Sequence, residues 1–454
     1  MPYEDLAAHV AATAQRFGIP GVSVAVLTDG QEHYASHGVT SVEHPRPVDE
    51  NTLFPIASAT KTITATALVR LAAEGKVDLD APVHHYVPEL ALADETATRS
   101  ITVMNLLNHT AGLDWNLLDT DGDGSLASFV AKMDALALVA EPGTRASYSQ
   151  AGYNLAGYVI EKVTGLPYEK AVAQLVLEPA GLSHTFFDHD DVMVRSFAVG
   201  YHSAEDGTLS PATPWKAYAA GQRGNNPGGG AVSTAADLLR WARFHLGTGD
   251  GALPTEALHR MREQTVEVRA SSLGDGLGIC WFLREVDGVR TLGQGGSGNG
   301  QFSEILIVPE RNFAVVSLAN AGPDGYTFNQ SVVRWALEHY LGVVDRDPEP
   351  VPYDAARAQE VSGRYEIDVM NLDIATDGER LTLAVGIKPE IRAASDVEMP
   401  QDYPAATIGF LPGDGDEYIV TDGGLQGQLG FFTRDAHGTV TGVDLAGRLF
   451  PRRP

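Results

Sequence analysis

The sequence has very little of three things: cysteine, long apolar runs and positive charge. Its 454 residues include one cysteine, Cys280, which excludes an internal disulfide. No apolar run approaches the roughly 18–20 residues that cross a bilayer. Residues 1–5 lack the basic and apolar regions of a signal peptide. These absences predict a cytoplasmic protein with neither a disulfide framework nor a membrane partner.

Acidic residues outnumber lysine and arginine by 59 to 32, and the formal net charge is −27. Contacts with nucleic-acid phosphates need clustered basic side chains, so this charge argues against a nucleic-acid partner. It also argues against docking on anionic lipid. Solubility is the simplest interpretation of the charge. An acidic host and a preference for cationic substrates are the alternatives.

The length and the apolar pattern predict two domains. Helical patterns occur in residues 4–17, 58–73, 101–113, 151–164, 235–244 and 329–341. Strand patterns occur in residues 22–27, 33–37, 303–308 and 313–318. A proline-rich, charged stretch over 345–354 predicts a linker. Short alternating segments beyond it predict a small all-β, barrel-like domain over 355–454, with strands at 363–367, 381–385, 418–420, 427–433 and 440–445.

The residues that point to chemistry begin with Ser58 and Lys61, in the segment Phe-Pro-Ile-Ala-Ser-Ala-Thr-Lys. Residues three apart share a helix face, so the Lys61 amine can reach the Ser58 hydroxyl. A serine is a weak nucleophile until a base takes its proton, and a buried lysine can serve because desolvation lowers its pKa. Ser-x-x-Lys alone is a weak motif, and the alternative is a helix cap with a lysine there by chance.

Two further motifs accompany it: Tyr148-Ser-Gln150 before a predicted helix, and Gly-Gln294-Gly-Gly-Ser before a predicted hairpin. With supporting segments over 101–112 and 228–237, residues 1 to about 345 resemble the class C β-lactamase and penicillin-binding-protein-like serine hydrolases. That group includes esterases, D-aminopeptidases and peptide-cyclising enzymes. The resemblance implies an α/β fold for residues 1–344: an antiparallel sheet flanked by helices, with a mostly helical subdomain. A lipocalin-like barrel would follow.

The resemblance also implies roles for particular residues. Ser58 would be the nucleophile and Lys61 its proton partner. Tyr148 would be a second acid/base group, its phenol pKa lowered by the lysine charge. The backbone N–H groups of Ser58 and Ser297 would form the oxyanion hole. The substrate, a small molecule or a peptide, would contact residues Gln150, Gln294, Gly295 and Gly296. No cofactor and no metal are expected, and the oligomeric state is open.

Two residues depart from the family pattern. Gln150 stands where the family usually has Asn, and Gln294 stands where it usually has Lys or His. A neutral side chain cannot offer a charge-assisted bond to a carboxylate, which leads to the hypothesis that the substrate needs no free carboxylate. The leading function is hydrolysis of an ester or amide through acyl-Ser58. The alternatives are acyl transfer or peptide cyclisation through the same intermediate, and a non-catalytic binding protein on this scaffold.

Other residues have plain interpretations beside functional ones. His109 is expected to be structural, and Cys280 to be a small buried side chain. Residues 119–124 resemble the start of a calcium loop, but Val130 stands where a bidentate Glu is needed, so a solvated acidic loop is favoured. Trp115, Trp215 and Tyr218 line the pocket or belong to ordinary packing.

Overall fold

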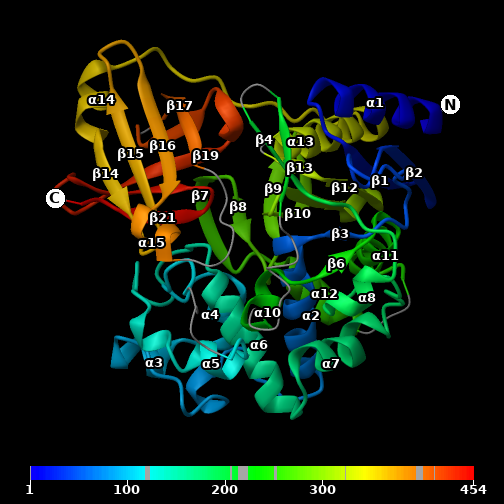
Figure 1. Cartoon of the computed structure of the whole chain (residues 1–454). Helices are drawn as coiled ribbons and strands as arrows, with labels where there is room; N and C mark the ends of the chain where they lie inside the picture. The colour runs from blue at the N-terminus through cyan, green and yellow to red at the C-terminus, as the bar shows by residue number, and fades with distance from the viewer. Residues whose placement is uncertain are drawn as a thin grey trace.

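The computed structural model describes residues 2–117, 123–204, 207–212, 223–249, 253–322, 324–394, 402–413 and 415–453. Figure 1 shows an antiparallel sheet between helices, a helical part below it, and a second sheet formed by the C-terminal residues, drawn yellow to red. The two termini lie on opposite sides of the molecule. The residues 119–122, Trp215 and Tyr218 singled out above lie outside the described residues.

Eight strands form the main sheet, and all neighbours in it are antiparallel. Strand β1 is apolar on both faces because helices cover both sides of the sheet. In spatial order the strands are β2 (Gln31–Gly38), β1 (Gly21–Thr28), β12 (Phe313–Ala319), β11 (Gln301–Val308), β10 (Val289–Gly298), β9 (Phe282–Val286), β8 (Gly274–Leu277) and β7 (Val266–Ser271).

Helices α1 (Pro2–Arg16) and α13 (Asp324–Ala336) cover one face of this sheet and share a core with it. The other face packs against α2 (Thr60–Ala73), α11 (Ala235–Leu246) and α12 (Thr255–Arg262). α2 is buried nearly all round, as its apolar sequence predicts. Thr234 caps α11 by accepting the Asp237 N–H.

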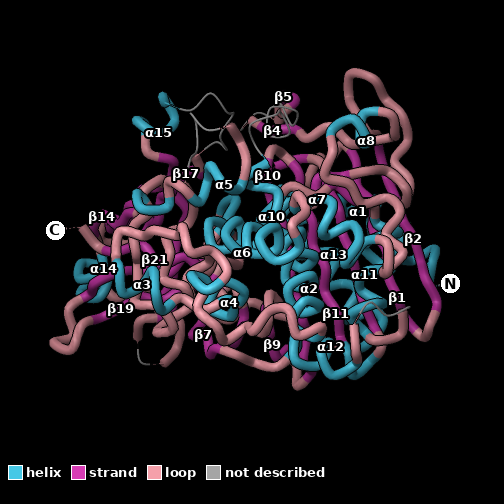
Figure 2. The backbone as a smooth tube through the Cα atoms, turned by 90° about the horizontal axis from the view of Figure 1, so that it is seen from below, coloured by secondary structure: helices cyan, strands magenta, loops and turns pink. Residues whose placement is uncertain are grey.

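A mostly helical part is inserted between β2 and β7. Its helices are α3 (Glu95–Ser100), α4 (Val103–Leu107), α5 (Leu126–Val130), α6 (Gln150–Thr164), α7 (Tyr168–Val172), α8 (His189–Met193) and α10 (Asn226–Gly229). Short strands join its connections: β3 (Phe54–Pro55) with β6 (Val232–Ser233), and β4 (Tyr201–Ser203) with β5 (Leu209–Pro211) and β13 (Ala321–Gly322). Figure 2 shows α2, α6 and α10 together between the two sheets.

The C-terminal part begins with α14 (Ala355–Val361) and continues as an eight-stranded antiparallel meander interrupted by α15 (Pro389–Ala394). A bridge between Tyr365 and Arg452 joins its first and last strands, so the sheet is nearly a closed barrel. The strands are β14 (Gly363–Glu366), β15 (Met370–Thr376), β16 (Leu381–Ile387), β17 (Tyr403–Phe410), β18 (Glu417–Val420), β19 (Leu429–Arg434), β20 (Val440–Leu445) and β21 (Arg448–Pro451).

The barrel lies directly against the main sheet, with β7 and β8 beside β19 in Figure 1. The Ser272 hydroxyl accepts the Leu429 N–H at 2.9 Å. The Arg269 guanidinium pairs with Glu417, also at 2.9 Å. Residues 345–354 have no regular secondary structure, and Asp345 at their start is paired with Arg284 at 3.1 Å. These contacts fix the barrel against the edge of the sheet.

The predicted fold class is confirmed, whereas some elements differ from the expectation. The helix expected over 101–113 ends at Leu107, because His109 has a left-handed backbone (φ 59°) that breaks it. Three barrel strands, β15, β17 and β21, were not predicted. Among the described residues no helix is long and apolar enough to cross a membrane. The domain limits at 344 and 355 stay predictions.

The barrel core generates a prediction about stability. The Tyr418 hydroxyl is fully buried and donates to the Asp444 main-chain carbonyl at 2.6 Å. Tyr418→Phe deletes this bond, and we expect a loss of about 1–2 kcal/mol in the free energy of unfolding. Urea unfolding followed by tyrosine and tryptophan fluorescence measures it. Tyr353→Phe, at an exposed position, is the control. Equal unfolding midpoints for Tyr418→Phe and wild type would contradict the prediction.

Candidate active site

Ser58 lies in a short 3₁₀ turn, Ala57–Ala59, that leads into α2. Ala57 has a left-handed backbone with φ of 43°, a conformation that alanine rarely adopts. The Ile56 carbonyl just before it accepts the Ser303 hydroxyl of β11 at 2.8 Å. The surrounding structure therefore holds a strained turn that positions the serine at the start of a helix.

Lys61 is fully buried, and its amine has three polar contacts among the described residues. Nζ donates to Gln150 Oε1 and to the Gly228 carbonyl, each at 2.6 Å, and lies 3.2 Å from Ser58 Oγ. Burial lowers the pKa of Lys61 well below its usual value; a charge on Cys280 would raise it and the Arg448 charge lowers it. An uncharged amine has two N–H bonds for the two carbonyls, which leaves its lone pair for the Ser58 hydroxyl.

Within the described residues no carboxylate comes within 4.0 Å of Lys61. The thiol of Cys280 is buried beneath it, and burial raises its pKa to about 12, so it is uncharged near neutrality. Its prediction as a small buried side chain is confirmed. The lysine environment therefore favours the free base.

Tyr148 lies over the same amine, with Lys61 Nζ 4.8 Å from the centre of its ring. Burial raises the pKa of Tyr148 to about 12, although a hydrogen bond with Ser58 and the Arg448 charge each lower it. The prediction that the lysine charge lowers this pKa is wrong, because desolvation outweighs the charges nearby. Near neutrality Tyr148 is a phenol, which can donate a proton but holds no negative charge.

The His109 ring packs against the Tyr148 ring. Its ring centre lies 4.3 Å from that of Tyr148, and its Nδ1 accepts the Ser149 N–H at 3.2 Å. Burial lowers its pKa well below 6.5, so the imidazole is uncharged. The Ser149 hydroxyl in turn caps α6 by accepting the Gly152 N–H. This packing agrees with the structural role expected for His109.

Gln150 and Gln294, the two residues that depart from the family pattern, both contact other residues of the site. Gln150 begins α6 and contacts Lys61, as described above. Gln294 is only 1% exposed, and its Nε2 donates to the carbonyls of Gly295 at 3.1 Å and Ser58 at 3.4 Å. Gln294 therefore packs beneath the nucleophile turn. Its predicted contact with substrate, like that of Gln150, stays a prediction.

Strand β10 approaches the Ser58 turn closely at Gly296. A Cβ built on Gly296 would lie 2.2 Å from the Ile56 carbonyl and 2.8 Å from the Ser58 nitrogen, so only glycine fits. Ser297 follows on the same strand. This close approach fits the predicted oxyanion hole of Ser58 and Ser297, which stays a prediction. Within the described residues no cluster of three or more metal-ligating side chains occurs.

The structure adds one residue that the sequence reasoning missed. Arg448 begins β21 and places its Cζ 5.1 Å from the centre of the Tyr148 ring and 5.8 Å from that of Trp115. No motif marks it. The only sequence signal is Ala446-Gly447 between two short apolar runs, which predicts a hairpin turn. Both turn residues have left-handed backbones, with φ of 52° and 73°.

Arg448 changes the electrostatics inferred from the sequence. Among the described residues it has no carboxylate within 4.0 Å. The hypothesis that the substrate needs no carboxylate assumed that Gln294 leaves the site without a cation to meet one. Arg448 places a cation of the barrel beside Tyr148, and the hypothesis about the carboxylate stays a prediction.

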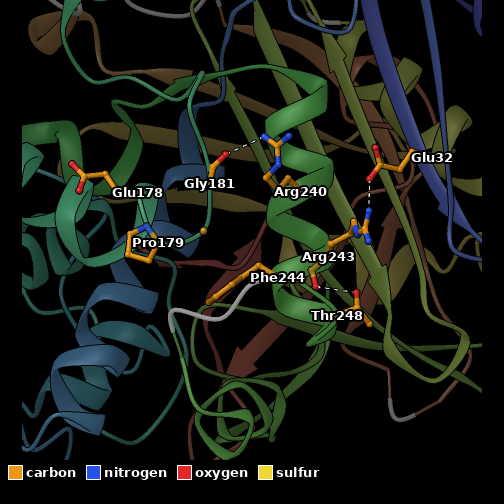
Figure 3. A pocket seen from close by; sticks show the side chains of 10 residues that line it. Glu32, Glu178, Pro179, Gly181, Arg240, Arg243, Phe244 and Thr248 are labelled. Carbon is orange, nitrogen blue, oxygen red and sulfur yellow. Dashed lines mark hydrogen bonds and ion pairs between the residues drawn. The ribbon is translucent and has the colours of Figure 1, made fainter.

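A separate hollow of about 550 Å³ lies on the surface between α11 and β2 (Figure 3). Its two arginines are already paired: Arg243 bonds to Glu32 at 2.6 Å, and Arg240 bonds to the Gly181 carbonyl at 3.0 Å. None of the candidate catalytic residues lines it. We assign no reaction to this hollow.

Comparison with known proteins identifies the family of the chain. The Beta-lactamase family model matches residues 6–334. Penicillin-binding protein 4 of Amycolatopsis lactamdurans is 32% identical over 366 residues, 77% of this chain and 93% of that protein. The structure of SurE with D-Leu superposes over 99% of both chains, with a TM-score of 0.75 and 25% identity.

A second solved structure matches a smaller share of the chain. The class C β-lactamase from Rhodobacter sphaeroides covers 73% of this chain and 99% of its own, with a TM-score of 0.61 and 25% identity. SurE thus resembles nearly the whole fold, and the β-lactamase resembles about three quarters of it. The chain belongs to the beta-lactamase family of serine hydrolases.

Proposed function

We propose that this protein transfers acyl groups from a carboxylic ester or amide through an acyl-Ser58 intermediate, with water as the ordinary acceptor. The observation that carries the proposal is the Lys61 amine, buried, without a carboxylate partner among the described residues, and 3.2 Å from Ser58 Oγ. A base must be unprotonated and within hydrogen-bond reach of the proton that it takes. Burial lowers the pKa of Lys61 well below its usual value and favours the unprotonated amine, and Ser58 Oγ lies within its reach.

In the first step Ser58 Oγ attacks the substrate carbonyl carbon, and the hydroxyl proton passes to the lone pair of Lys61. The carbonyl oxygen gains the electron pair, and the backbone N–H groups of Ser58 and Ser297 stabilise it. When the carbonyl re-forms, the bond to the leaving group breaks. That group takes its proton from the Tyr148 hydroxyl, and the Lys61 ammonium restores the proton to Tyr148.

Tyr148 suits the acid role because its pKa of about 12 keeps it protonated before the reaction. In the second step an acceptor attacks the acyl-enzyme and passes its proton back through the same groups. Water gives hydrolysis. An amine gives acyl transfer or cyclisation, and the D-Leu complex of SurE supports an acceptor related to an amino acid.

The non-catalytic alternative rests on Gln150 and Gln294. The position of Gln150 weighs against it, since this side chain holds Lys61 at 2.6 Å. An amide oxygen accepts from an uncharged amine without attracting a proton to it. The replacement keeps a neutral contact with the lysine and adds no carboxylate beside it, which weighs against a site that has lost its chemistry.

The first test compares wild type with Ser58→Ala. We expect wild type to release p-nitrophenolate from short-chain p-nitrophenyl esters and to gain the acyl mass on brief mixing. Ser58→Ala should lose at least about 10³-fold in rate and all of the adduct, because no other group replaces the nucleophile. Ser183→Ala, at an exposed position, is the control. Equal turnover and labelling in Ser58→Ala would exclude the proposal.

The acceptor is tested in the same assay. Added D-leucine or D-leucinamide should yield an N-acyl product, detected by mass spectrometry, if amines intercept the acyl-enzyme. Production of the free acid alone would favour hydrolysis.

A further prediction concerns Gln150. Gln150→Glu places a carboxylate beside Lys61 and should raise the lysine pKa by about 1–3 units. Because the unprotonated lysine is the active form, the acid limb of the kcat/KM profile should move to higher pH. Activity should fall at least about tenfold at pH 7 and recover in alkaline buffer. Gln15→Glu, exposed on α1, is the control. A loss of the same size at every pH would contradict this explanation.

A further inference from the structure

Arg448 and Lys61 are two cations arranged around one aromatic ring. Their charged groups lie 5.1 Å and 4.8 Å from the centre of Tyr148, so they are no more than about 10 Å apart. One belongs to the barrel and the other to the hydrolase fold. Within the described residues neither has a carboxylate within 4.0 Å.

The position of Arg448 is fixed by the hairpin that carries it. The Gly447 carbonyl accepts the Tyr148 N–H at 2.7 Å, and the Leu449 N–H donates to the Ser147 hydroxyl at 3.3 Å. A Cβ built on Gly447 would lie 2.1 Å from the side chain of Leu273, which lies between β7 and β8 of the main sheet. The barrel turn therefore packs tightly against the sheet. The two bonds bracket Arg448 in sequence and join it to the catalytic segment.

An arginine can remain charged here without an acidic partner. Its guanidinium is delocalised, weakly hydrated and protonated at all ordinary pH values. The rings of Trp115 and Tyr148 stabilise a cation through their quadrupoles. An aromatic ring offsets part of the free-energy cost of burying the guanidinium and leaves its positive charge in place. A carboxylate would neutralise that charge. The positive field of Arg448 therefore reaches Lys61.

The other titratable groups around this pair are His109, Tyr153, Cys280, Tyr403 and Asp444. Burial keeps the first three uncharged near neutrality, and it raises the pKa of Tyr403. Asp444 is the one acid among them. Burial raises its pKa to about 7, and its Oδ1 accepts from Ser271 Oγ and the Gly447 N–H, each at 3.3 Å.

We propose that Arg448 adds to burial in favouring the uncharged, proton-accepting form of Lys61, so that the C-terminal barrel shifts the pH range over which Ser58 is acylated. This inference rests on the proposed role of Lys61 as the base. Two unit charges about 10 Å apart, at an effective dielectric constant of about 20, shift a proton equilibrium by roughly one pH unit. The Arg448 charge also lowers the pKa of Tyr148. Its removal should therefore shift both groups in the same direction, upward.

The direct test measures the pKa of Lys61 without any turnover. The chain has seven lysines, so ¹³Cε-lysine NMR gives few signals, and Lys61→Met identifies the one that matters. We expect Lys61 to titrate well below 10.5 in wild type and about one unit higher in Arg448→Met. Arg453→Met, near the other end of the same hairpin strand and exposed, should leave the value unchanged. An unchanged Lys61 pKa in Arg448→Met would overturn the proposal.

Kinetics give the second readout. The rate of Ser58 acylation by p-nitrophenyl butyrate, a neutral ester, is followed against pH from the burst and the intact mass. Arg448→Met should move the acid limb upward by about one unit, a tenfold loss below the limb, and keep the plateau. An effect limited to KM for carboxylate-bearing esters would overturn the proposal and make Arg448 a substrate-binding residue. A uniform loss at all pH values would also overturn it.

Two further controls distinguish failure of this proposal from misfolding of a variant and from failure of the proposed function. Arg448→Gln is made alongside Arg448→Met, and far-UV and near-UV circular dichroism confirm that each is folded. If wild type acquires no acyl adduct, the proposed function fails, and the NMR titration still decides whether Arg448 depresses the pKa of Lys61.

Discussion

The burial of the Lys61 amine governs how the groups around Ser58 are arranged. Lys61 is enclosed by the core of the hydrolase fold, and removing its ammonium form from water lowers its pKa well below the usual value, which favours the free amine. That amine then needs acceptors for its two N–H bonds. Gln150 and the Gly228 carbonyl supply them, so the amine is held in place by neutral groups that do not restore its charge.

Holding this arrangement requires strain at several points. Ala57, His109 and Cys280 all have left-handed backbones, and each lies beside the serine, the tyrosine or the lysine. Each such residue is unfavourable by about 1–3 kcal/mol, and it persists where the surrounding packing leaves no alternative. Here the packing comes from α2, α6 and the main sheet, which share one large apolar core. Strain at the site thus depends on stability elsewhere.

The barrel belongs to the same electrostatic system. Its β20–β21 turn bonds to the main chain of Tyr148, and Trp115 packs against the barrel core while its carbonyl accepts the first N–H groups of α6. A shift of the barrel would therefore move Tyr148 and the helix that carries Gln150 together. The two parts of the chain are therefore linked at residues of the candidate active site.

The fold class could be predicted from the sequence, which also singled out Ser58 and Lys61 as candidate catalytic residues. Periodicity predicted α1, α2, α6, α11 and the hairpin of β11 and β12, because each has enough residues of one pattern to override local ambiguity. Ser58 and Lys61 are three residues apart, so their contact follows from local geometry. Strands β15, β17 and β21 were not predicted because they contain residues that strands disfavour: Asn371 and Asp373 in β15, Pro404 and Gly409 in β17, and Pro451 in β21.

The protonation states of the groups around Ser58 depend on the tertiary structure and could not be predicted from the sequence. The pKa of Tyr148 rises because its ring is buried by residues far away in sequence, which no local pattern contains. Gln294 is packed beneath Ser58, and Arg448 arrives from 390 positions later in the chain. Desolvation and Coulomb interactions depend on distance in space. A sequence orders residues along the chain, so it names the serine and the lysine but leaves the protonation of their neighbours to the fold.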